Sequence, residues 1–171
     1  MGELGPRENR RGVPAARGVK NMANKYVTEE AKKQIGKAGE ARTIEVERGA
    51  IRRFAEAIGD PNPLFNNEAE ARHTRFGGMI APPTFCRSLS AAIPDVKLDM
   101  GESFRGLDGG SDWEYFEPIR PGDRITVQTK IADLRESAGR LGAMVFITTE
   151  TSYTNQFGKV CALQRSTAIR Y

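Results

Sequence analysis

The sequence has little of what marks several specialised classes of protein. It contains two cysteines, Cys86 and Cys161, which stand far apart and have no metal-ligand spacing. We therefore expect two small buried side chains in a reducing cytoplasm and no metal site. No apolar run approaches the roughly 18 residues that a membrane-spanning helix needs. No apolar core of a secretory signal lies near the N-terminus either, so the sequence predicts a cytoplasmic protein without a membrane partner.

Charge of one sign is also scarce outside a single segment. The net charge is +4, but residues 1–24 hold five basic and two acidic side chains and so contribute +3 of it. The rest of the chain is nearly neutral and lacks the one-sided field of a nucleic-acid-binding protein. We expect no nucleic-acid partner.

The first 24 residues differ from the rest in composition. They are rich in glycine, proline and arginine and show no periodicity, which predicts a disordered basic tail. Met22 resembles a natural start, so we interpret residues 1–21 as vector-derived or upstream sequence. An arginine-rich targeting peptide fits less well, because the tail also contains acidic residues. Residues 25–171 have the length of one domain.

Helical patterns dominate the first half of that domain. Thr28 can cap a short helix over residues 28–36, and an alternating strand pattern follows at 43–47. Apolar residues at helical spacing then predict a helix over 51–58, ended by Gly59.

A proline-punctuated stretch separates this helix from two further helical patterns. Residues 60–67 are polar and predict a loop, and Asn67 can cap a helical turn over 68–73. Apolar residues at helical spacing predict a more buried helix over 82–93, ending before Pro94.

From residue 103 the apolar period changes from about 3.6 to two, which predicts strands. Glycine, proline and asparagine clusters divide this half into separate runs. Helices followed by antiparallel strands indicate an α+β domain, in which the helix at 82–93 covers the sheet. The strand patterns lie near 113–115, 125–131, 145–153 and 161–169, with turns at 121–123, 139–142 and 155–158.

One region gathers groups suited to adding water to an enoyl thioester. That reaction needs a base for the water, an acid for the α-carbon and donors for the enolate oxygen. Asp60 follows a helix end in a proline-fixed loop, and Asn62 offers both donors and an acceptor. Gly77 and Gly78 allow close backbone approach before the predicted central helix.

Three segments in this order resemble the MaoC-like hydratase/dehydratase family, in particular its N-terminal, fatty-synthase-type dehydratase-like domains. The first resembles the hydratase motif Gly-Asp-x-Asn-Pro-Leu-His. The likeness covers roughly residues 40–170. The segments are Gly59-Asp60-Pro61-Asn62-Pro63-Leu64-Phe65, then Thr74 to Phe85, then Leu107 to Phe116 with Pro121 to Ile125.

The resemblance implies a hot-dog fold, in which a central helix is wrapped by a long antiparallel sheet and paired with a second hot dog. It places the family's catalytic aspartate at Asp60 and the motif asparagine at Asn62. The catalytic histidine position holds Phe65, which cannot transfer a proton. Active members also have a His-Gly pair at the helix entry, where the glycine amide is the oxyanion donor. This chain has Pro82 and Pro83 there, and proline has no backbone N–H.

The same likeness suggests substrate-binding positions at Phe65, Gly77, Gly78, Ile80 and Arg75. Arginines in this region, Arg72, Arg75 and Arg87, are candidates for the phosphates of a CoA or phosphopantetheine thioester. No cofactor is expected beyond that thioester substrate.

Each candidate also has a purely structural interpretation. An aspartate after a helix-ending glycine is a common loop residue, and an asparagine before a proline is a common turn former. Phe65 suits a core or pocket wall. The single histidine, His73, lies in a polar stretch, which favours the surface over catalysis.

Three hypotheses follow. The first is the non-catalytic half of an enoyl-thioester hydratase or dehydratase, which shapes the acyl pocket for a second hot-dog subunit in a heterodimer or heterotetramer. The second is a self-sufficient homodimeric hydratase or thioesterase that uses Asp60. The third is an acyl-thioester-binding protein without chemistry.

Overall fold

The computed structural model describes residues 25–101, 104–139 and 142–171. The predicted tail at 1–24 lies outside the described residues, as does the centre of the turn expected at 139–142.

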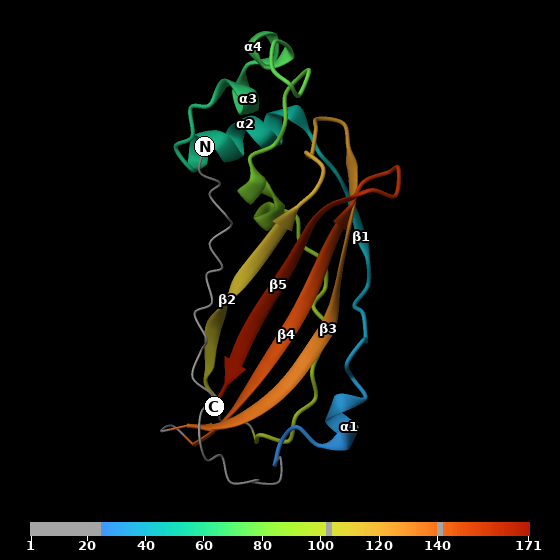
Figure 1. The fold of residues 1–171 in the computed structure, drawn as a ribbon, viewed down its shortest axis with the longest axis vertical. Coiled ribbons are helices and arrows are strands. Elements are labelled where there is room, and N and C mark those ends of the chain that lie inside the picture. The colour runs from blue at the N-terminus through green and yellow to red at the C-terminus, as the bar shows by residue number, and fades with distance from the viewer. Residues whose placement is uncertain (1–24, 102–103, 140–141) are drawn as a thin grey trace, which may run out of the picture.

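The fold is built on one five-stranded antiparallel sheet (Figure 1). The strand order is β1-β3-β4-β5-β2, so the first strand and the second lie at opposite edges. The predicted C-terminal strands are confirmed. The strands of the sheet are β1 Arg42–Glu45, β2 Gly106–Tyr115, β3 Arg124–Gly139, β4 Gly142–Thr154 and β5 Val160–Arg170.

The turns predicted at 121–123 and 155–158 also form where the sequence placed them. Asn155 accepts hydrogen bonds from the backbone N–H groups of Phe157 and Lys159, each at 3.0 Å. Gly158 has φ +74°, a conformation that glycine adopts without strain. Gly122, with φ +87°, donates its N–H to the Val46 carbonyl at 2.8 Å and joins the 121–123 turn to the end of β1.

The outer face of the sheet carries alternating charges across neighbouring strands. Lys130 on β3 pairs with Glu150 on β4 at 2.7 Å, and Glu150 also pairs with Arg165 on β5 at 2.9 Å. These residues are direct cross-strand neighbours in the register. Opposite charges at such positions stabilise a sheet and keep this face in contact with water.

The helices gather mainly at one end of the sheet (Figure 1). They are α2 Arg48–Ala57, α3 Pro63–Asn66 and α4 Glu68–Arg72, whereas α1 Glu29–Lys32 lies at the opposite end. Gly59 ends α2 with φ +68°, as predicted. The Thr28 hydroxyl caps α1, which is shorter than the predicted 28–36.

The predicted loop at 60–67 is partly wrong, because it contains α3. The Asn62 side chain accepts the N–H of Leu64 at 3.0 Å, and Pro63 occupies the first helical position. Both residues favour helix starts as well as turns, since an N-cap and a first-turn proline satisfy or remove unpaired amides.

The predicted helix at 82–93 is also wrong over half its length. Only a 3₁₀ helix, η1 Pro83–Ser88, forms there, and Leu89 is already extended at φ −99° and ψ 105°. The apolar spacing that predicted a helix reflects burial of Phe85 and Leu89, while Ile93 is 71% exposed. Beyond η1 the inner face of the sheet is therefore covered by a segment that is not helical.

Two apolar clusters pack on that inner face. The larger cluster joins α2, α3 and η1 to the end of the sheet where the helices gather, and it includes Ile51, Phe65 and Val127. The smaller, around Ile131 and Val145, lies toward the other end with Val27. The Glu136 carboxylate accepts the N–H groups of Tyr26 and Val27 at 2.8 and 3.0 Å, which fixes this N-terminal segment to β3.

Ile51 should make a large contribution to stability because it is fully buried between α2 and the sheet. We expect Ile51→Ala to lower the free energy of unfolding by about 2–5 kcal/mol. Ile58 is the matched control, because it follows α2 and is 48% exposed. Ile58→Ala should change the free energy of unfolding by less than about 0.5 kcal/mol. Urea unfolding of both variants measures the difference, and equal losses would contradict this packing.

Candidate functional site

A cavity of about 320 Å³ opens between η1, the end of β2 and the start of β5. Its wall is largely apolar, with polar groups at a few positions, as is typical of small-molecule sites. The lining residues are Arg75, Phe76, Ile80, Ala81, Pro82, Pro83, Cys86, Tyr115, Phe116, Glu117, Pro118, Ile119, Cys161 and Ala162. We call this space the entry cavity.

The predicted site residues divide between this cavity and its surroundings. Arg75 and Ile80 line it, together with Pro82 and Pro83 from the helix entry. Phe65 is 5% exposed and lies in the larger apolar cluster, outside the cavity wall.

Asp60 and Asn62 lie outside the cavity wall and are engaged in local structure. The Asp60 carboxylate accepts the N–H of Asn62 at 3.0 Å, and the Asn62 side chain in turn caps α3. Asn62 lines a separate pocket beside α4. The two motif residues therefore shape the loop, and neither lines the entry cavity.

Gly77 and Gly78 lead the chain from α4 into the cavity wall. Gly77 has φ +66°, which a side chain would strain. Gly78 is buried, and a Cβ there would lie 3.5 Å from the Glu68 carboxylate. Their role in the structure is to bring residue 80 beside α3.

The backbone amides of residues 80–83 are bonded elsewhere or absent. The Ile80 N–H bonds the Leu64 carbonyl at 3.1 Å, and the Ala81 N–H bonds the Ile119 carbonyl at 2.8 Å. Pro82 and Pro83 have no N–H to donate. Residues 80–83 therefore offer no free backbone donor for a thioester oxygen in the cavity.

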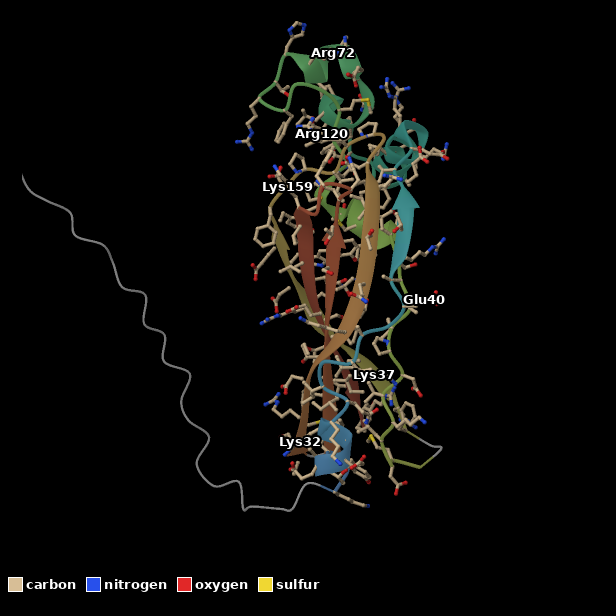
Figure 2. All side chains as sticks on the ribbon, turned by 90° about the vertical axis from the view of Figure 1, so that its right-hand side faces the viewer. Lys32, Lys37, Glu40, Arg72, Arg120 and Lys159 are labelled. Atoms are coloured by element: carbon tan, nitrogen blue, oxygen red, sulfur yellow. The ribbon has the colours of Figure 1, made fainter. Side chains whose placement is uncertain are left out.

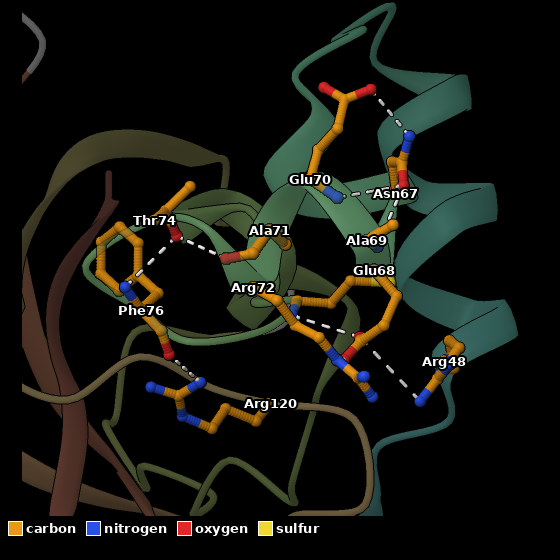
Figure 3. A network of polar contacts seen from close by, with 11 residues as sticks. Arg48, Asn67, Glu68, Ala69, Glu70, Ala71, Arg72, Thr74, Phe76 and Arg120 are labelled. Atoms are coloured by element: carbon orange, nitrogen blue, oxygen red, sulfur yellow. Dashed lines mark hydrogen bonds and ion pairs between the residues drawn. The ribbon is translucent and has the colours of Figure 1, made fainter.

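A polar network around Glu68 holds the segment that leads into the cavity (Figure 3). The Glu68 carboxylate accepts from Arg72 Nε at 3.0 Å and from the Met79 N–H at 3.4 Å, and Arg48 lies 4.0 Å away. The hydrogen bond from Arg72 lowers the pKa of Glu68 below its ordinary 4.5. Partial desolvation opposes this shift, and the hydrogen bond from the Met79 N–H adds to it. Asn67 caps α4 through the amides of residues 69 and 70.

Cationic side chains lie at the cavity end of the molecule. Arg120, Lys159 and Arg72 all lie toward that end (Figure 2). Arg120 donates to the Phe76 carbonyl at 2.8 Å, and Arg75 stacks over the Phe76 ring at 4.8 Å. Lys159 pairs with Glu117 at 3.6 Å.

Sequence reasoning missed much of the cavity wall. Cys86 and Cys161 lie in it, and burial raises their pKa values to about 12 and about 11, so both thiols stay protonated and unreactive at neutral pH. Tyr115 and Phe116 at the end of β2 also line the cavity, while remaining about half exposed. Only the family likeness of their segment pointed to them.

The other candidates lie apart from this cavity. His73 is exposed at the end of α4, and Arg87 lines a different cavity. Within the described ranges no group of acidic, histidine or cysteine side chains is placed to hold a metal ion. None of the helices described is both long and apolar enough to span a membrane.

The antiparallel sheet, the short covering helix and the cavity at its edge define a hot-dog protein, as its structural neighbours confirm. The model of the family described as FAS1-like, dehydratase domain region, matches residues 33–164, and the chain belongs to that family.

Two curated relatives show the range of matched proteins. A UPF0336 protein of Thermobifida fusca is 41% identical over 100 residues, which covers 56% of this chain and 65% of that protein. A probable enoyl-CoA hydratase alpha subunit of Thermomonospora curvata is 32% identical over 138 residues, which covers 71% of this chain and 43% of that protein. The chain thus spans just under two thirds of the first and less than half of the second.

Two solved structures share the fold. The MaoC-like dehydratase from Rhodospirillum rubrum superposes with a TM-score of 0.66 at 24% identity, covering 80% of this chain and 92% of that one. The ChsH1-ChsH2 complex from Mycobacterium tuberculosis gives 0.66 at 18% identity, covering 83% and 87%. The predicted hot-dog fold and the resemblance to MaoC-like proteins are confirmed.

The Glu68 network predicts a pH-dependent stability. The folded-state pKa of Glu68 is lowered, so its contribution is present above 4.5 and is lost as the pH falls through the folded value. We expect Glu68→Gln to lower the melting temperature by a few degrees at neutral pH, with a gap that narrows toward about pH 4.

The exposed Glu56 on α2 provides the matched control. Glu56→Gln should follow the parent protein at every pH in the same thermal melts. A gap between Glu68→Gln and the parent that stays constant with pH would rule out the carboxylate as its source.

Proposed function

We propose that this chain is the non-catalytic half of an enoyl-thioester hydratase or dehydratase, which shapes the acyl pocket for a partner that carries the catalytic Asp and His. The observation that carries the proposal is the chemistry of the entry cavity. Its wall holds no histidine and not Asp60, and the amides of residues 80–83 are bonded elsewhere or replaced by proline. Base and oxyanion donor each contribute on the order of a hundredfold or more to such reactions.

The substrate of the assembly is proposed to be an acyl group on CoA or on a phosphopantetheine carrier. The apolar cavity wall suits the acyl part, and the cations in and near the wall suit phosphate groups. Arg75 lies in the wall itself, with Arg120 and Lys159 close to the same end. No other cofactor is needed for this role.

The partner is proposed to be a second hot-dog subunit that adds to the open edge at β2. Every β2 residue except Trp113 is exposed, and β2 is an outermost strand. Its apolar members Leu107 and Tyr115 are 51% and 48% exposed, which is unusual on a water-facing edge. The alpha-subunit name of the Thermomonospora relative agrees with an assembly of unlike chains.

The proposal predicts how the two halves divide the chemistry. The purified chain alone should show no hydration of enoyl-CoA, and the complex with a co-expressed hot dog that has an intact motif should be active. In that complex, Asp60→Asn should change kcat by less than about tenfold. The equivalent change in the partner's motif aspartate should lower kcat by about a hundredfold or more.

The comparison between the two aspartates decides between the hypotheses. If the chain alone is active and Asp60→Asn abolishes that activity, the protein is a self-sufficient enzyme. Tight thioester binding with no turnover in any pairing would instead identify a binding protein.

Leu107 tests the proposed interface without touching the cavity. Leu107→Glu should weaken assembly by at least about tenfold, because a carboxylate loses hydration when an apolar edge is covered. Phe157, which is 77% exposed at the turn between β4 and β5, is the control, and Phe157→Glu should assemble normally. Sedimentation velocity measures both, and an unchanged Leu107→Glu complex would place the interface elsewhere.

A further inference from the structure

A second cavity, of about 290 Å³, lies on the inner face of the sheet beyond η1. Its roof is the extended segment after η1, with Leu89, Ala91 and Ile93, where sequence patterns had predicted a helix. Its floor is polar and comprises Thr129, Thr149, Thr151, Tyr153, Gln164 and Ser166. We call it the inner cavity.

The polar floor interrupts the apolar core in a regular way. Thr129, Thr151 and Gln164 are direct cross-strand neighbours and form one row across β3, β4 and β5. Thr149 and Ser166 pair in the next row. The larger apolar cluster lies on one side of these rows and the smaller cluster on the other.

The buried groups in these rows can accept a further partner. The Gln164 side chain, 9% exposed, donates to Ser111 at 3.2 Å and accepts from the Tyr153 hydroxyl at 3.4 Å. An amide side chain has two N–H donors and two acceptor positions, so these two contacts use half of its capacity. Burial raises the pKa of Tyr153 to about 12, so its hydroxyl stays protonated.

The entry cavity and the inner cavity follow one another along the same strand. Ala162 lines the first, and Gln164 and Ser166 line the second, all on the same face of β5 because side chains alternate along a strand. On η1, Cys86 faces the first and Arg87 the second. From residue 162 to 166 the strand rises about 13 Å, which a medium-length acyl chain can span.

We propose that the inner cavity binds a hydroxyl or keto group on the distal part of the acyl chain, so that the assembly selects oxygenated acyl thioesters over plain hydrocarbon ones. This rests on the proposed function, in which the acyl thioester enters through the entry cavity. A plain chain would remove water from Gln164 and its neighbours without replacing the lost hydrogen bonds, which costs free energy. A hydroxyl at that depth restores them.

Isothermal titration calorimetry tests the proposal by comparing the affinities of two thioesters whose acyl chains have equal length. The full chain is used, in whatever assembly forms on purification. The probes are decanoyl-CoA and 10-hydroxydecanoyl-CoA. We expect the hydroxylated thioester to bind about fivefold to tenfold more tightly, as one net hydrogen bond provides. Gln164→Leu should bring that ratio close to one while decanoyl-CoA still binds.

Gln128 supplies the matched control, because it is exposed on β3 beside buried neighbours and bonds the Gly39 carbonyl at 3.3 Å. Gln128→Leu should keep the preference. If Gln164→Leu does not fold, as judged by its melting curve, Thr151→Val takes its place with the same expectation.

The outcomes separate this inference from the proposed function. Equal binding of the two thioesters by the parent protein would overturn the inference and leave the proposed function standing. A preference that survives Gln164→Leu, or Thr151→Val where that variant replaces it, would do the same. No binding of either thioester would overturn the proposed acyl role and this inference with it.

Discussion

The structure depends on covering the inner face of one antiparallel sheet with very little helix. Apolar side chains on β3 and β4 must be removed from water, yet η1 has only six residues. The chain meets this constraint by packing α2 and α3 over one end and by drawing the extended segment after Leu89 along the rest. The space that this thin covering leaves open is the inner cavity.

The contacts that hold this cover in place also limit the chemistry. Ile80 and Ala81 are fixed by backbone hydrogen bonds to Leu64 and Ile119, which join the helical end to the segment after β2. The next two positions, where the resemblance places the oxyanion donor, hold Pro82 and Pro83, so residues 80–83 leave no backbone N–H free for a ligand. A hot-dog subunit without a free N–H at residues 80–83 suits the supporting role in a hydratase or dehydratase assembly that we propose.

Much of the fold could be predicted because its signals are local. The period of two gave β3, β4 and β5, and Asn155 and Gly158 marked the turn between the last two. Thr28 and Asn67 marked helix starts through caps that their own side chains make. The errors fell where local signals are ambiguous, as when apolar spacing near Leu89 fitted both a helix and a buried extended segment.

The amino-acid order was enough to predict the succession of helices and then strands, the hot-dog likeness, the phenylalanine at position 65 and the missing N–H groups of Pro82 and Pro83. Those features follow from residue identity and short-range periodicity. The structure was needed to show that the Asp60 carboxylate bonds the N–H of Asn62 within its own loop. It was also needed to place Cys86 and Cys161 in one cavity wall and Thr129, Thr151 and Gln164 in one polar row. The cavity wall and the polar row depend on packing and strand register between residues far apart in the chain, which no local pattern specifies.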